Sequence, residues 1–266
     1  MNRRDFVAAS VGASLLPAFG EGGTESARTG VTPQVLELRR YRLRIGPMEA
    51  RFLEYQKNVL VAALNRAGVK PVGAFSVAVG PEAPCVYLLL PHPSADSVVT
   101  LADRLAADPE YRAGAATFRS LPATDPPYIR RESSLMAAFD TMPAVEIPTG
   151  PPAAASRVFE LRTYESHNEA AGVKKIEMFE KGGEIAIFRR VGLTPVFFGR
   201  NVIASTLPSL TYMLVFADGA ARERSWGAFG HDPDWLKLRA TPGYADPEVL
   251  SNITNVLLRP TDYSQI

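Results

Sequence analysis

The chain has 266 residues, enough for two ordinary domains or one large one, and its 46% hydrophobic and 21% charged residues are typical of a globular protein. Its 29 basic and 28 acidic residues give a formal net charge of +1, which argues against nucleic acid as a partner. The single Cys85 excludes an internal disulfide and a cysteine-built metal cluster, and its apolar neighbours predict a buried thiol.

The first twenty residues predict an export signal. Arg3 and Arg4 precede a short apolar stretch, and the small residues Ala18 and Gly20 follow as a cleavage pair. The apolar stretch is too short to cross a bilayer, so no transmembrane segment is expected. The order of arginine pair, apolar stretch and small residues resembles a twin-arginine export signal and predicts a periplasmic or secreted protein. The alternative is an ordinary basic N-terminus.

The chain carries one sequence pattern twice. The segment VLELRRY at 35–41 matches VFELRTY at 158–164, and AGVKPV at 67–72 matches VGLTPV at 191–196. Two further matched pairs are the apolar runs around Tyr87 and Tyr212 and the Asp-Pro motifs at Asp108 and Asp232. The offset between the copies stays between 123 and 125 residues, which predicts a tandem duplication.

The duplication divides the chain into five parts. We predict an export signal, a flexible leader, a first domain, a proline-rich linker and a second domain. Their predicted bounds are 1–20, 21–33, 34–141, 142–156 and 157–266.

Each copy predicts the element order β, α, β, β, α, β. In the first copy, strands are expected at 34–43, 71–80, 85–91 and 128–138. Helices are expected at 47–66 and from Ser94. Gly68 ends the first helix, and Asp108 caps a short extra helix. In the second copy, Gly182 and Gly183 predict a break in the first helix.

This order predicts an α+β fold of the ferredoxin-like plan, in which an antiparallel sheet carries both helices on one face. The other face of such a sheet is bare. Two copies in one chain can cover each other by placing these bare faces together. We therefore predict an intrachain pseudo-dimer, with a closed or nearly closed barrel and helices outside.

Strand periodicity predicts which side chains point into the barrel. In the second copy Phe159, Leu161 and Thr163 share one face and are expected to meet the helices. The opposite face, and its equivalent in the first copy, would then line the barrel interior. The predicted ligand-binding residues are therefore Glu37, Arg39, Tyr41, Glu160, Arg162 and Tyr164. They suit a small carboxylate, carbonyl or phenol, and the alternative is a structural Glu-Arg network.

The histidines add one candidate catalytic residue. His167 follows the second copy's strand, and with Arg162 and Tyr164 it forms the set of catalytic candidates. A surface or capping role is the alternative for His167. His92 and His231 are interpreted as loop residues. No metal-binding spacing, GxSxG motif or phosphate-binding glycine loop occurs, so we predict no metal and no cofactor.

The ELRxY strand, the segments GGEIAIFRRVGLTPVFFG and TYMLVF, and the motif HDPDW together resemble the NIPSNAP family, within the dimeric α+β barrel superfamily. The resemblance covers about 34–260 and is stronger in the second copy, because the first copy lacks the Gly-Gly pair. It implies the fold more than an activity. The superfamily includes monooxygenases and proteins that only bind, whereas the NIPSNAP branch is mostly described through interaction and trafficking. The resemblance also makes a homo-oligomer plausible.

Two functions remain open. The chain would bind a small organic ligand or a protein partner through the barrel. Alternatively, it would be a cofactor-independent monooxygenase or isomerase that acts on a small aromatic or carbonyl compound, with Arg39, Arg162, Tyr41 or Tyr164 polarising the carbonyl. An open, partly apolar cavity beside these groups is the observation that the enzyme hypothesis requires.

Overall fold

The computed structural model describes residues 32–149 and 156–266. The export signal predicted at 1–20 and nearly all of the leader predicted at 21–33 lie outside the described residues. So do residues 150–155 of the predicted linker.

The first half folds in the predicted order, with each helix divided into pieces. Its elements are β1 (Val35–Arg42), α1 (Pro47–Tyr55), a π-helical turn η1 (Gln56–Leu60), α2 (Val61–Arg66), β2 (Gly73–Val79), β3 (Cys85–His92), α3 (Ala95–Val99), α4 (Leu101–Ala107), α5 (Pro109–Arg119) and β4 (Arg130–Ala138). Gly68 adopts a left-handed φ of 82° just after α2, as expected for a helix end. The Asp108 side chain accepts hydrogen bonds from the first backbone amides of α5 and so caps it, as predicted.

The second half repeats this succession. Its elements are β5 (Val158–Glu165), α6 (Glu169–Glu180), α7 (Glu184–Arg190), β6 (Thr194–Ile203), β7 (Ser209–Phe216), α8 (Gly219–Gly230), α9 (Pro233–Arg239), α10 (Asp246–Val249) and β8 (Asn252–Pro260). The break between α6 and α7 falls at Gly182-Gly183, where Gly183 has a φ of 81°, so the predicted interruption is confirmed.

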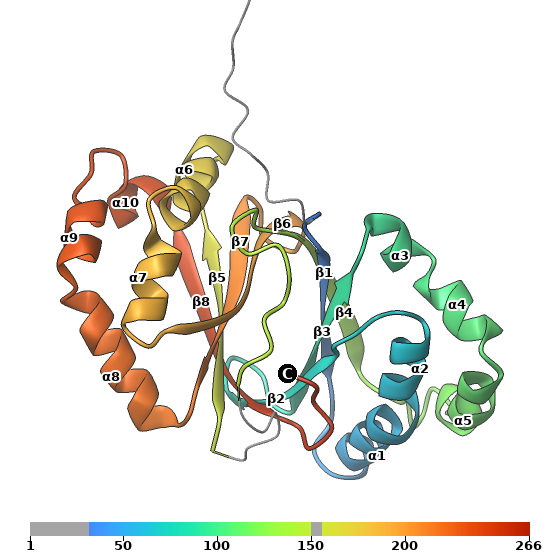
Figure 1. Cartoon of the computed structure of the whole chain (residues 1–266). Coiled ribbons are helices and arrows are strands. Elements are labelled where there is room, and N and C mark those ends of the chain that lie inside the picture. The colour runs from blue at the N-terminus through green and yellow to red at the C-terminus, as the bar shows by residue number, and fades with distance from the viewer. Residues whose placement is uncertain (1–31, 150–155) are drawn as a thin grey trace, which may run out of the picture. The chain divides into compact units, whose positions relative to one another are not determined.

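The eight strands close into one antiparallel barrel in the order β1-β3-β2-β8-β5-β7-β6-β4. Each half contributes four neighbouring strands. The halves are joined at two equivalent seams, where β2 pairs with β8 and β4 pairs with β6. The helices of the first half and those of the second half lie on opposite sides of the barrel (Figure 1). The expected closed barrel with helices outside is therefore confirmed.

The barrel interior is packed with apolar side chains from both halves. One buried cluster takes at least one residue from every strand, including Leu36, Leu38, Phe75, Leu89, Met136, Phe159, Leu161, Phe197, Met213 and Leu258. Only the interior of the barrel can bring side chains from all eight strands together. Two further clusters lie between the sheet and the helices, one in each half, and they contain Tyr41 and Tyr164 respectively.

The predicted orientation of the strands is therefore wrong. Phe159 and Leu161 point into the barrel, and the Glu-Arg-Tyr faces of β1 and β5 point toward the helices. The physical reason is the size of an eight-stranded barrel, whose interior is just wide enough for side chains to fill and to exclude water. Burial favours the most apolar face there, and charged groups go where helices or solvent supply partners.

Candidate functional site

Glu160 of the second half sits at the centre of a saturated hydrogen-bond network between β5 and α8. Its carboxylate is fully buried and accepts five hydrogen bonds. The donors are Arg162 Nη1 at 3.0 Å, and Arg222 Nε, Arg222 Nη2, Trp226 Nε1 and Asn255 Nδ2 at 2.7 Å each. Arg222 and Trp226 come from α8, so this helix closes over the carboxylate. The network leaves Glu160 no free acceptor position for a ligand.

Aromatic rings enclose the two other members of the second set. The Arg162 guanidinium lies 4.7 Å from the Trp226 ring centroid and 5.4 Å from that of Tyr164. Tyr212 donates a hydrogen bond of 2.9 Å from its hydroxyl to the hydroxyl of Tyr164. Burial raises the pKa of Tyr212 well above its usual value, so this phenol stays protonated.

A buried ion pair occupies the neighbouring space under α6 and α7. Lys175 Nζ lies 3.0 Å from Glu184 Oε2, and both side chains are 2% exposed. The Lys175 ammonium also lies 4.6 Å from the Phe179 ring centroid and 5.5 Å from those of Tyr164 and Trp235. Side chains of the second half therefore satisfy the buried carboxylates of both Glu160 and Glu184, as the structural alternative for the Glu-Arg-Tyr set of this half expects.

The first half holds its glutamate with fewer partners. Glu37 accepts hydrogen bonds from Arg39 Nε at 2.7 Å and Arg39 Nη2 at 2.9 Å, and from Ser133 Oγ at 2.5 Å. His92 Nε2 lies 3.5 Å from Glu37 Oε2. Burial by itself would raise the pKa of Glu37. The nearby His92, the hydrogen bonds from Arg39 and Ser133 and the charge of Arg39 outweigh burial and lower this pKa to about 2.

The helix residues that cover Glu160 have no counterpart over Glu37. Asp218 and Asp232 cap α8 and α9 in the second half, and Ser94 and Asp108 cap α3 and α5 at positions 124 residues earlier. The same offset places Val98 at the position of Arg222 and Ala102 at that of Trp226. Neither small side chain can reach the carboxylate as arginine and tryptophan do. Space opens at this point of the first half, beside Glu37.

That space is a cavity of about 490 Å³ between the sheet and the helices α3 to α5. Its aromatic lining is Tyr41, Phe52, Tyr55, Tyr111, Phe118 and Tyr128. Its charged lining is Glu37, Arg39, Arg119 and Arg131, and the rest is aliphatic and includes Val98 and Ala102. A cavity of this volume, with aromatic walls and a few convergent polar groups, has properties of small-molecule sites.

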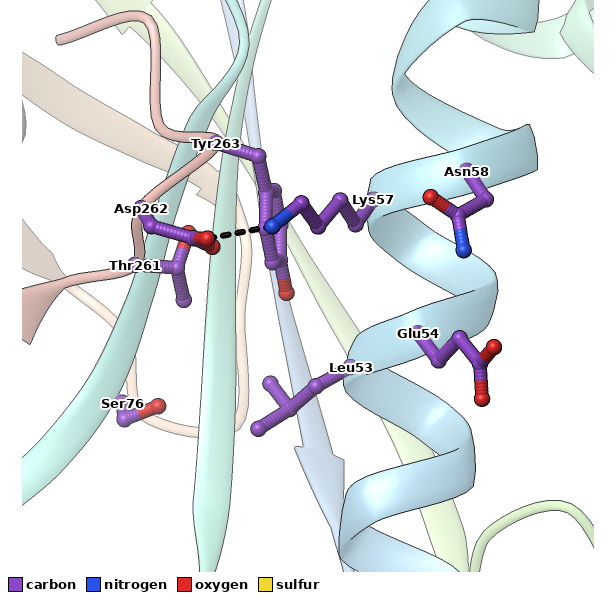
Figure 2. Close-up of a pocket in the computed structure, with 8 residues that line it drawn as sticks. All are labelled: Leu53, Glu54, Lys57, Asn58, Ser76, Thr261, Asp262 and Tyr263. Atoms are coloured by element: carbon purple, nitrogen blue, oxygen red, sulfur yellow. Dashed lines mark hydrogen bonds and ion pairs between the residues drawn. The ribbon is translucent and has the colours of Figure 1, made fainter.

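Two other depressions differ from this cavity. One of about 480 Å³ lies between α1, η1 and the C-terminal segment, where Lys57 reaches across to pair with Asp262 (Figure 2). It shares no lining residue with the cavity beside Glu37. The other, of about 250 Å³, lies at one end of the barrel and is lined largely by hydroxyl and charged groups such as Thr163, Thr211 and Glu165. Neither is lined by any of the six residues predicted to bind a ligand.

The predicted site residues therefore separate into two groups. The structure brings Glu37, Arg39 and Tyr41 to the cavity, and it places Glu160, Arg162 and Tyr164 in the filled network of the other half. His167 is exposed at the start of α6 and forms no hydrogen bond or ion pair with any described residue. It lies in the half opposite the cavity.

Sequence reasoning missed His92. Flanking prolines suggested a loop, but His92 ends β3, is fully buried and contacts both Glu37 and Ser97 Oγ, the latter at 3.1 Å from Nδ1. It also missed Val98 and Ala102. The signal was present, because aligning the two copies at an offset of 124 shows arginine and tryptophan replaced by two small residues.

Among the described residues, no group of three or more histidine, cysteine, aspartate or glutamate side chains is placed to hold a metal ion. None of the helices formed by residues 32–149 and 156–266 is long and apolar enough to cross a membrane.

The lowered pKa of Glu37 predicts a pH dependence of stability. Because the folded pKa of about 2 lies below the ordinary value of 4.5, the contribution of this carboxylate is fully present above about pH 4.5. It is lost as the pH falls toward 2, and amounts to roughly 3 kcal/mol. Urea unfolding between about pH 6 and pH 2.5 should therefore show a steeper acid loss for the wild type than for Glu37→Gln.

The half-buried Glu49 provides the matched control. It forms no hydrogen bond or ion pair with any described residue, so Glu49→Gln should leave the acid profile of the wild type unchanged. Superimposable profiles for the wild type and Glu37→Gln would contradict the prediction.

Comparisons with known proteins agree with the duplicated fold. The NIPSNAP family model matches residues 36–130 and 159–265. A protein from Lactobacillus acidophilus NCFM, provisionally assigned as a monooxygenase, has a similar structure with a TM-score of 0.58 and 10% identity, over 86% of this chain and 94% of that one. An anthrone oxidase-like protein has a TM-score of 0.51 and 10% identity, over 86% and 91% of the two chains. These identities are too low to show more than a shared fold.

An uncharacterised NIPSNAP-like domain protein from Burkholderia xenovorans is 22% identical, with a TM-score of 0.37, over 42% of this chain and 92% of its own. No curated protein gives a significant match. The two segments matched by the family model make up most of the chain and fall on the two halves of the barrel. The chain therefore belongs to the NIPSNAP family.

Proposed function

We propose that the first half of this NIPSNAP protein binds a small aromatic compound in the cavity beside Glu37, Arg39 and Tyr41. The observation that carries the proposal is the difference between the halves at two aligned positions. Arg222 and Trp226 complete the network of Glu160, and Val98 and Ala102 leave the equivalent space empty. On this proposal, the second half is a structural support for the first.

The cavity walls favour a planar ring. Tyr55 stacks on Phe118 with 3.8 Å between ring centroids, and Tyr41 meets Tyr128 edge to face at 5.3 Å. Such walls offer both flat and edge contacts to an aromatic ligand. Arg39 donates from Nε and Nη2 to Glu37 and also lies beside the Tyr41 hydroxyl, so Arg39 Nη1 and Tyr41 together face a ligand oxygen as donors. Burial raises the pKa of Tyr41 more than the nearby arginines lower it, so its phenol also remains a hydrogen-bond donor.

The asymmetry predicts a stoichiometry of one ligand per chain. Titration of the full chain with 2-naphthol, followed by native mass spectrometry and fluorescence, should show one bound molecule. Arg39→Ala should weaken binding by about tenfold, because a buried donor to the ligand is lost. Arg162→Ala is the matched control in the second half and should leave the affinity unchanged. Two bound molecules per chain, or equal effects of the two variants, would contradict the proposal.

A second candidate function is a cofactor-independent monooxygenase or isomerase acting on a small aromatic or carbonyl compound. It is supported by the shared fold of the monooxygenase-like and anthrone oxidase-like neighbours, and by donors able to polarise a carbonyl. Against it, a carboxylate with a pKa of about 2 is a weak base at neutral pH, so Glu37 is poorly suited to proton abstraction. Oxygen uptake in the presence of a bound ligand would favour a monooxygenase, and conversion of the ligand without oxygen uptake would favour an isomerase. A ligand that is bound and recovered unchanged would favour a binding protein.

We propose further that the protein is exported, on the support of the twin-arginine order at the N-terminus. Fractionation of cells that produce the full chain would test this. We also propose that each half follows the ferredoxin-like plan. The equivalent strand orders β4-β1-β3-β2 and β8-β5-β7-β6, each with its helices on one face, support this assignment.

A further inference from the structure

The charged groups that line the cavity are unbalanced. Arg39 pairs bidentately with Glu37, and this pair is neutral as a unit. Arg119, in the last turn of α5, and Arg131, in β4, form no ion pair with any residue in the described parts of the chain. Both side chains are exposed and also line the cavity, so they lie at its opening. The site therefore carries two uncompensated positive charges.

We infer that the ligand of this cavity is an aromatic carboxylate, with its ring between the aromatic walls and its anionic group toward Arg119 and Arg131. This inference rests on the proposed function and specifies its ligand class. Arginine favours carboxylates because its planar guanidinium can donate two parallel hydrogen bonds. The aromatic rings of the wall disfavour a small inorganic anion, which would lose part of its hydration beside them without gaining comparable contacts.

The tyrosines of the cavity do not supply the missing negative charge. Burial is the main cause that raises the pKa of both Tyr41 and Tyr55, and the charges of Arg131 and Arg119 reduce these increases only in part. Both phenols are neutral at physiological pH. The positive charge at the opening remains uncompensated until an anion binds.

A pair of probes of the same shape tests the inference. Isothermal titration of the full chain at pH 7 compares 2-naphthoate, which is ionised, with 2-naphthamide, which is neutral. The carboxylate should bind at least about tenfold more tightly at low salt, and this ratio should shrink at high salt as screening increases. Arg119→Gln and Arg131→Gln should each reduce the ratio about threefold. Arg112→Gln, on the same helix as Arg119 but outside the cavity lining, removes one charge and should leave the ratio unchanged.

The outcomes separate the inference from the function on which it rests. If both probes bind equally, or if the preference survives Arg119→Gln and Arg131→Gln, the anionic ligand class is wrong and the aromatic site remains. If neither probe binds, the aromatic site itself is wrong and the ligand class falls with it.

Discussion

Replacement of Glu160 by alanine is expected to lower the free energy of unfolding by about 3 kcal/mol. The reason is the number of donors that lose their acceptor at once. Arg162, Arg222, Trp226 and Asn255 all donate to this fully buried carboxylate. Removing one member of a buried charged network leaves the others desolvated without a partner. The Arg222 side chain is 24% exposed, so water can replace part of the hydrogen bonding that it loses. The expected loss of stability therefore falls at the lower end of the range for buried ion pairs.

Glu165→Ala is the control on the same strand. Glu165 is half-buried and accepts a hydrogen bond from Asn252 Nδ2 at 2.9 Å, so its replacement should cost less than about 1 kcal/mol. Urea unfolding at neutral pH, with circular dichroism of the native state, measures both values. Similar losses for the two variants would mean that the network around Glu160 does not stabilise the second half.

Ala102→Trp is expected to weaken ligand binding by at least about 100-fold with little change in stability. The substitution places in the first half the residue found at the aligned position of the second. An indole there would occupy the cavity and bring a donor toward Glu37, as Trp226 Nε1 donates to Glu160. Because Ala102 is exposed to the cavity, the larger side chain replaces empty space and displaces no packed group.

Ala107→Trp, on the same helix but outside the lining of this cavity, should leave binding intact and so controls for the added bulk. Binding is measured with 2-naphthol, and thermal unfolding shows whether each variant keeps the fold. An Ala102→Trp protein that is folded and still binds normally would place the ligand elsewhere.

Much of the fold could be predicted because the repeat constrains it. Four matched segments at a nearly constant offset predicted the duplication, and residues with a local structural role predicted element ends. Gly68, Gly182-Gly183 and Asp108 act through backbone conformation or capping, which depend on neighbours in sequence. The π-helical turn η1 and the division between α3 and α4 were not predictable in this way, since they depend on packing against the sheet.

The orientation of β1 and β5 could not be obtained from alternation alone. A period of two separates Leu161 from Arg162 but does not state which of the two faces meets the helices. The choice depends on the volume inside the closed barrel, which is a property of all eight strands together. The six predicted residues were therefore recognised as polar faces of β1 and β5, but these faces were assigned to the barrel interior when they point toward the helices.

The asymmetry of the site was missed for a different reason. Matching segments revealed what the copies share, and the cavity depends on where they differ. Val98 in α3 and Ala102 in α4 are unremarkable residues until they are aligned with Arg222 and Trp226. His92 was not predicted to lie buried beside Glu37, because the prolines on both sides of it suggested a loop.

The two seams that join β2 to β8 and β4 to β6 have a consequence for how the protein could diverge. In a barrel built from two identical chains, each mutation occurs twice, so a tryptophan that fills one site fills both. Here one gene encodes both halves, and each aligned position can change separately. One half can be stabilised by bulky side chains that hydrogen-bond to one another. The other half can have smaller side chains that leave a cavity for a ligand. Covalent fusion thus relieves the trade-off between stability and binding that symmetry would impose on a homodimer.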